Sequence, residues 1–75
     1  MWQASVRRRA RFEDFVDVVD LDGKAQSLPA TSCEVEEHHA YVALRFGSDE
    51  QRVVRIARQR FSELIAARQL VYLSW

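Results

Sequence analysis

The 75-residue chain suffices for one small domain, and 48% apolar residues with two glycines and one proline exclude disordered and low-complexity proteins. The longest purely apolar run covers residues 40–44, far short of the roughly 20 residues of a membrane-spanning helix, so no membrane partner is expected. Eleven basic and eleven acidic side chains cancel, and the overall charge therefore identifies no partner.

The charges are nevertheless segregated along the chain. Residues 1–11 hold four arginines and no acid, residues 12–39 hold eight acids against Lys24, and residues 40–75 hold six arginines against three acids. The commoner explanation is that these blocks neutralise one another in the fold. The alternative is that a basic surface stays free for an anionic partner. We treat residues 1–75 as a single domain in which residues 1–11 form a possible basic arm.

The first third of the chain predicts a β-hairpin. Asp22-Gly23 is the strongest short hairpin signal, it is flanked by the candidate arms 18–21 and 24–28, and Pro29 ends the second arm. A helix over residues 5–20 remains an alternative because apolar residues there recur at helical spacing. Four arginines at its start and aspartates at its end would, however, oppose the helix dipole.

Three more elements follow. Alternating apolar residues over 40–46 predict a half-buried strand that extends back toward Val35. A capping-box pattern, Ser48 with Gln51, and an apolar stripe at three- and four-residue spacing predict a helix over about 49–68. Residues 70–75 predict a final strand. A strand, a helix and a strand in this order favour a right-handed crossover with the two strands parallel.

Together these elements predict an α+β fold. A small mixed sheet contains the hairpin about Asp22-Gly23, a third strand at about 35–46 and a final strand at about 70–75, and one amphipathic helix at about 49–68 packs on one face. One helix leaves the second face open, although both faces carry apolar groups, so we expect a homodimer that buries this face. The expected interface residues are Tyr41, Val71, Leu73 and Trp75. The alternative is that the first segment folds over this face.

Catalytic and metal sites are poorly supported. Cys33 and His39 on one strand would lie about 20 Å apart, so Cys33 is interpreted as a buried thiol rather than a nucleophile. Glu36 with His38, or Glu37 with His39, supplies two ligands on one face, whereas a metal site needs three or four. We therefore expect no catalytic residue, no metal and no cofactor, and we assign no role to the two histidines.

Two groups of arginines are the candidate partner-binding residues. The basic arm contributes Arg7, Arg8, Arg9 and Arg11, which together with the nearby aromatic residues Trp2 and Phe12 suit phosphate pairing and base stacking. The alternative is that this arm pairs with the acidic middle segment as a cross-strand partner. On the predicted helix, Arg52, Arg55 and Arg58 lie opposite the apolar stripe. The commoner explanation is that these three arginines are exposed to solvent and bind nothing. The alternative is that they form a contact surface for a partner.

These observations predict a small non-enzymatic protein-binding module that acts as a homodimer and binds an unidentified protein. Ten of the eleven basic residues are arginine, a bias typical of G+C-rich genomes, so we expect a bacterial or mobile-element protein. A single cysteine fits a reducing cytoplasm. The alternative function is a small nucleic-acid-binding or regulatory protein that uses residues 7–11 with Arg52, Arg55 and Arg58. An enzyme with a site assembled between two subunits ranks third.

Overall fold

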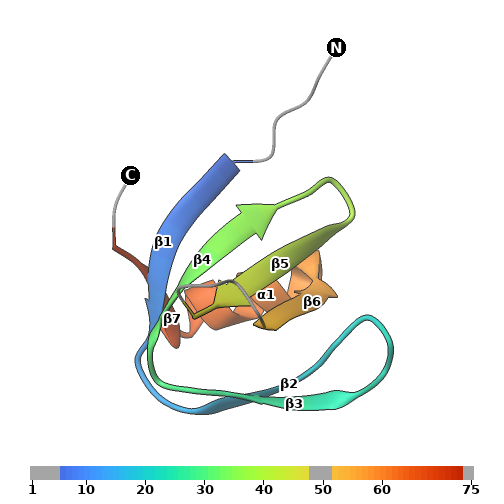
Figure 1. Ribbon diagram of the computed structural model, residues 1–75, viewed down its shortest axis with the longest axis horizontal. Coiled ribbons are helices and arrows are strands. Elements are labelled where there is room, and N and C mark those ends of the chain that lie inside the picture. Colours follow the sequence, from blue (N-terminus) through green and yellow to red (C-terminus); the bar gives the residue numbers. More distant parts are fainter. Residues whose placement is uncertain (1–5, 48–51, 74–75) are drawn as a thin grey trace.

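The computed structural model describes residues 6–47 and 52–73, which form seven strands and one helix (Figure 1). The predicted α+β class is confirmed. In chain order the elements are β1 (Val6–Phe12), β2 (Val16–Val19), β3 (Ala25–Leu28), β4 (Ser32–Glu37), β5 (Tyr41–Phe46), β6 (Arg52–Ala57), α1 (Arg58–Ala66) and β7 (Leu70–Tyr72).

The strands form two antiparallel sheets. A five-stranded sheet has the order β6-β5-β4-β1-β7, and β2 pairs with β3 in a separate hairpin. Val35 of β4 lies opposite Leu44 of β5, which lies opposite Val54 of β6, so apolar side chains align in rows across the sheet. The β1 residue Ala10 lies between Cys33 of β4 and Tyr72 of β7.

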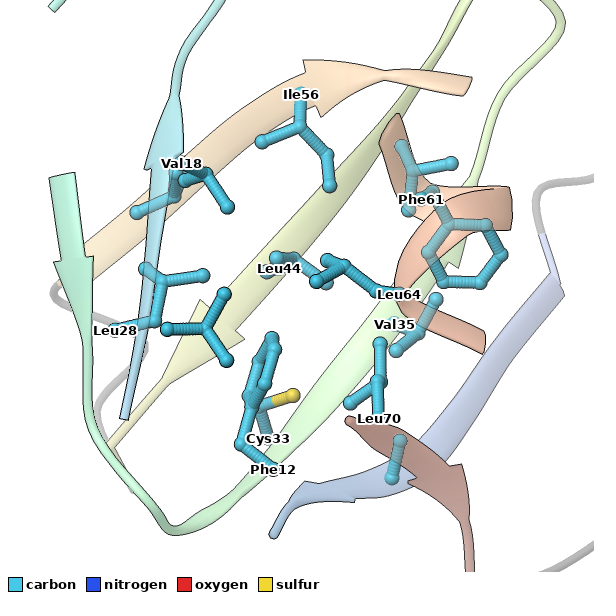
Figure 2. Close-up of a cluster of buried hydrophobic side chains, with 14 of the residues drawn as sticks. Phe12, Val18, Leu28, Cys33, Val35, Leu44, Ile56, Phe61, Leu64 and Leu70 are labelled. Carbon is cyan, nitrogen blue, oxygen red and sulfur yellow. The ribbon is translucent and has the colours of Figure 1, made fainter. Parts of the chain in front are cut away.

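One core joins the sheet, the helix and the hairpin. Because side chains alternate along a strand, each strand of the large sheet presents one set of residues to a common inner face. Val18 and Leu28 of the hairpin point into the same cluster as Leu44 of the sheet and Leu64 of the helix (Figure 2). Leu28, Leu44 and Leu64 are each fully buried, so all three layers contribute to the centre of this core.

The hairpin about Asp22-Gly23 is confirmed. Gly23 has a φ of 83°, in the left-handed region that glycine tolerates best, and its N–H donates to the Asp20 carbonyl. The Asp20 side chain closes the turn by accepting the N–H groups of Asp22 and Lys24, each at 2.9 Å. A third hydrogen bond, from Gln26, is the main reason why the pKa of Asp20 is lowered.

The predicted third strand at 35–46 is two strands. β4 ends at Glu37, the chain turns over residues 38–40, and β5 begins at Tyr41. The His38 N–H donates to the Tyr41 carbonyl at 2.9 Å and closes this turn. The inward positions change from odd numbers, such as Val35, to even numbers, such as Val42, and this change of phase is the sequence signal of the turn.

The predicted helix at 49–68 is wrong in its first half. Residues 52–57 form β6, and the helix begins at Arg58. Val54 and Ile56 alternate inward on β6, where pairing with β5 buries them, and β-branched residues suit this position. Residues 48–51, including the predicted capping box, lie outside the described residues. Within the described ranges, no helix has the length and apolar character needed to cross a membrane.

One further prediction is corrected, and the alternative helix over residues 5–20 does not form. The strands on either side of the predicted helix are not parallel, because β5 and β7 are separated by three antiparallel steps in the sheet and run in opposite directions. The first segment is not a helix: β1 is an interior strand of the sheet between β4 and β7, and its arginines point to both sides of the strand. The predicted final strand is confirmed as β7, and residues 74–75 lie outside the described residues.

Replacing Leu64 with alanine tests the contact between helix and sheet. Leu64 is fully buried, so Leu64→Ala should lower the free energy of unfolding by about 2–5 kcal/mol, a large fraction of the stability of a domain this small. Urea denaturation followed by circular dichroism measures this change. Ser62→Ala, at an exposed position of the same helix, should alter the stability by less than about 0.5 kcal/mol. Equal effects of the two substitutions would contradict the assigned core.

Candidate functional site

The candidate site is the face of the five-stranded sheet that points away from the core. Both α1 and the β2–β3 hairpin pack on the inner face, and no described element covers the other one. We call the opposite side the outer face. Its outward side chains are Arg7, Arg9 and Arg11 of β1, Ser32, Glu34 and Glu36 of β4, Tyr41, Ala43 and Arg45 of β5, Val53, Arg55 and Ala57 of β6, and Val71 of β7.

Glu36 is the electrostatic centre of the outer face. Its side chain is only 9% exposed, and three cationic or basic groups surround its carboxylate. Arg7 Nε lies at 3.0 Å, Arg45 Nη2 at 3.1 Å and His38 Nε2 at 3.0 Å. The hydrogen bond from Arg7 is the main cause that lowers the pKa of Glu36 to about 2, and His38 and Arg45 act in the same direction against the effect of burial.

The cross-strand register extends this network of charged residues to Glu34 and Arg9. Arg9 lies opposite Glu34, and Glu34 lies opposite Arg45, so acidic β4 separates two basic strands. The second guanidinium arm of Arg7 is 3.7 Å from Glu34 Oε1, which links the two glutamates through one arginine. Opposite charges directly across neighbouring strands stabilise the pairing of β1, β4 and β5.

The outer face keeps an excess of positive charge. Its strands present five arginines (Arg7, Arg9, Arg11, Arg45 and Arg55) against two glutamates (Glu34 and Glu36). Arg11 pairs with Glu13 in the following loop at 3.2 Å. Arg9 and Arg55 are exposed, and neither has an ion-pair partner among the described residues. The unneutralised charge therefore lies at these two positions.

A shallow hollow of about 630 Å³ adjoins one end of this face. Its lining includes Arg9, Ser32, Glu34 and Arg45, so basic and acidic groups alternate around it. Cys33 also borders the hollow but is buried, and burial, followed by the nearby Glu34 charge, raises the pKa of its thiol to about 12. The predicted buried thiol is confirmed, and such a thiol is a poor nucleophile at neutral pH.

The basic arm is divided between the two sides of β1. Arg7, Arg9 and Arg11 point to the outer face, whereas the Arg8 guanidinium lies over the Tyr72 ring at 5.3 Å from its centroid. The predicted alternative, that this arm pairs with the acidic middle segment across strands, is confirmed for Arg7. The four arginines therefore do not form one contact surface.

Arg52, Arg55 and Arg58 do not share a helix face as predicted. Arg52 and Arg55 lie on β6 at a spacing that places them on opposite sides of the strand. Arg52 donates to Gln26 Oε1 and to the Ser27 carbonyl, each at 3.1 Å. Arg58 donates to the His38 carbonyl at 2.7 Å. Of these three arginines, Arg55 alone projects from the outer face.

The predicted dimer residues do not form one patch. Tyr41 lies on β5 and Val71 on β7, three strand spacings or roughly 14 Å apart perpendicular to the strands, and the register places them at opposite ends along the strand direction. Leu73 follows β7, is 48% exposed and donates its N–H to the Arg9 carbonyl. Trp75 lies outside the described residues.

The histidines differ in their surroundings. His38 contacts Glu36 and stacks on Tyr41 with ring centroids 4.5 Å apart, whereas His39 is exposed in the turn. In the part of the chain that the structure describes, no three His, Cys, Asp or Glu side chains gather in an arrangement that would hold a metal ion. Sequence reasoning missed Glu36 as the buried anchor. The available signal was the alternation of Arg7, Arg9 and Arg11 matched by Glu34 and Glu36.

Comparison of the chain with protein-family models, with curated proteins and with solved structures gives no match.

The role of Glu36 can be measured through its titration. The pKa of Glu36 is lower in the folded state, so its contribution to stability is present above its ordinary pKa of 4.5 and disappears as the pH falls toward about 2. At neutral pH, Glu36→Gln should lower the free energy of unfolding by about 1–3 kcal/mol because it removes the buried charge that Arg7, Arg45 and His38 contact. Its stability should also fall less between these pH values than that of the unmodified chain.

Glu34→Gln is the matched control, because the Glu34 side chain is 43% exposed. We expect it to change the stability by less than about 1 kcal/mol at neutral pH. Chemical denaturation at several pH values distinguishes the two variants. If both variants lose the same stability, or if the stability of Glu36→Gln depends on acidic pH as that of the unmodified chain does, Glu36 is not the central carboxylate of the outer face.

Proposed function

We propose that the protein is a non-enzymatic protein-binding module that binds an acidic protein surface through its outer face. The observation that carries this proposal is the excess of arginine on a sheet face that no described element covers. Arg9 and Arg55 supply exposed charges without ion-pair partners among the described residues. A carboxylate on another molecule can therefore pair with them without displacing an existing partner.

The remainder of the outer face also suits a protein contact. Val53 and Val71 are 41% and 38% exposed at opposite edges of the sheet, and Leu73 extends the apolar margin beside β7. Aliphatic groups beside arginines are a common composition of protein interfaces. The Glu36 network holds Arg7 and Arg45 in place before any partner arrives, which reduces the entropy lost on binding.

The charge of the outer face disfavours one form of the predicted homodimer. Placing two outer faces against each other would oppose two surfaces that each carry an excess of arginine, and like charges across an interface weaken association. An acidic partner has no such cost. We therefore propose that the partner meets this face with carboxylates rather than with an identical face.

Nucleic acid ranks second as a partner. Several arginines predicted to reach phosphates are engaged within the chain: Arg7 binds Glu36, Arg52 binds the hairpin, and Arg58 binds the turn after β4. His38 and Tyr41 stack on each other, so neither ring offers both faces to a base. A cytoplasmic location and a bacterial or mobile-element origin remain predictions from the composition.

Binding to fluorescently labelled poly-L-glutamate, measured by anisotropy at low and at near-physiological salt, tests the proposal. The double variant Arg9→Gln/Arg55→Gln should fold normally and bind at least about fivefold more weakly, the equivalent of two exposed charge contacts of about 0.5 kcal/mol each. Salt should weaken binding of the unmodified chain more than that of the variant.

Arg68→Gln is the positional control for the loss of an arginine charge, because Arg68 lies in the connection between α1 and β7 rather than on the outer face. It should bind as the unmodified chain does. Equal weakening by Arg68→Gln, or no binding to polyglutamate at low salt, would refute the proposal. Tighter binding to an oligothymidylate with a steeper salt dependence would favour the nucleic-acid alternative.

A further inference from the structure

A second surface of this protein has the opposite charge. We define the acidic hairpin as residues 13–28, which include β2, β3 and the turn between them. It contains five acids (Glu13, Asp14, Asp17, Asp20 and Asp22) against Lys24. Asp20 is used inside the turn, whereas the carboxylates of Asp17 and Asp22 have no ion-pair partner among the described residues.

The acidic hairpin also carries the most exposed large apolar side chains of the described residues. Phe15 is 70% exposed, Val19 is 62% exposed and Leu21 is 50% exposed. Val16 and Val18 point into the core, so Asp17 and Val19 share the outward side of β2, and the exposed Phe15 directly precedes this strand. An outward side of this kind is usually polar in an antiparallel sheet, and the folding of this chain does not explain the exposed apolar side chains of Val19 and Phe15.

The chain does not lay its own acidic hairpin over its outer face. Among the described residues, the hairpin meets the sheet at the edge of β6, where the Leu21 N–H donates to the Arg55 carbonyl at 3.0 Å, and through the core. The inward side chains of the hairpin and of the large sheet meet in one core, where Val18 and Leu28 lie beside Leu44 (Figure 2). The outward side chains of these two layers consequently point away from this shared core. The acidic hairpin therefore does not cover the outer face of the same molecule, although the two surfaces are complementary in charge.

We infer that the acidic hairpin of one copy docks on the outer face of a second copy of this chain. This inference rests on the proposed function and identifies the acidic partner. The free carboxylates of Asp17 and Asp22 face arginines such as Arg9 and Arg55, and Phe15 and Val19 meet the apolar margins of the sheet. Because the chain has a formal net charge of zero, the two copies approach each other without net repulsion.

This contact has a definite consequence for assembly. It joins two different surfaces, so each contact leaves one outer face and one acidic hairpin unused at the ends of the assembly. Association should therefore continue beyond a dimer as the concentration rises, unless the copies close into a ring. Because oppositely charged groups carry the contact, salt should reduce the average mass.

Two variants, each lacking one surface, test the inference. The face variant is Arg9→Glu/Arg55→Glu, and the hairpin variant is Phe15→Ser/Asp17→Lys. Sedimentation velocity of the unmodified chain should show a mass that rises beyond that of a dimer with concentration. Each variant alone should remain monomeric. An equal mixture should form a dimer and stop there, because one intact hairpin meets one intact face. Arg68→Glu should associate as the unmodified chain does.

The outcomes separate this inference from the proposed function. A monomeric unmodified chain whose polyglutamate binding depends on Arg9 and Arg55 would refute self-docking and support the proposed function. A dimer that persists in both variants, or a mixture that stays monomeric, would refute the head-to-tail contact. No association together with no polyglutamate binding would refute both. If circular dichroism shows that a charge reversal unfolds the chain, Arg9→Gln/Arg55→Gln and Phe15→Ser/Asp17→Asn replace the reversals, with the same pattern expected at low salt.

Discussion

A buried carboxylate decides which face of the sheet meets water. Glu36 lies on an interior strand with its side chain almost fully buried, so its charge must be paired where it lies. Arg7, Arg45 and His38 meet this requirement from the same side of the sheet, and their polar groups make this side unsuitable for an apolar layer. The helix and the hairpin therefore share the opposite face, where the core lies, and no element among the described residues covers the charged outer face.

Local patterns predicted the parts of the fold that local interactions determine. The turn at Asp22-Gly23 follows from one glycine and its neighbours, and the alternation over 41–46 follows from a strand with a buried side. The helix failed over 52–57 because Val53, Val54 and Ala57 satisfy a helical spacing while β5 offers them a partner strand. This partner strand belongs to another segment of the chain, and no pattern within residues 52–57 reveals it.

In the candidate site, too, some features follow from the local sequence and others depend on distant segments. Alternating arginines on β1 and glutamates on β4 make cross-strand pairing readable from the sequence, yet the sequence does not identify Glu36 as the buried member, since burial depends on neighbours from β1 and β5. Arg52 and Arg55 separate to opposite sides because a spacing of three, which shares a face on a helix, alternates on a strand. Because residues 52–57 form a strand rather than part of the predicted helix, Arg52, Arg55 and Arg58 do not form the predicted binding surface. Of these three arginines, only Arg55 lies on the outer face.

The preference for arginine over lysine has a structural reason here besides codon usage. The planar guanidinium of Arg7 contacts Glu36 through Nε and lies near Glu34 through Nη1, so one side chain bridges two carboxylates on the same strand. A lysine ammonium is a single point donor and cannot span them in this way. Arg9 lies opposite Glu34, yet it is exposed and has no ion-pair partner among the described residues. Arg7, Arg11 and Arg45 form ion pairs within the chain, and the excess positive charge that the outer face presents to other molecules is therefore that of Arg9 and Arg55.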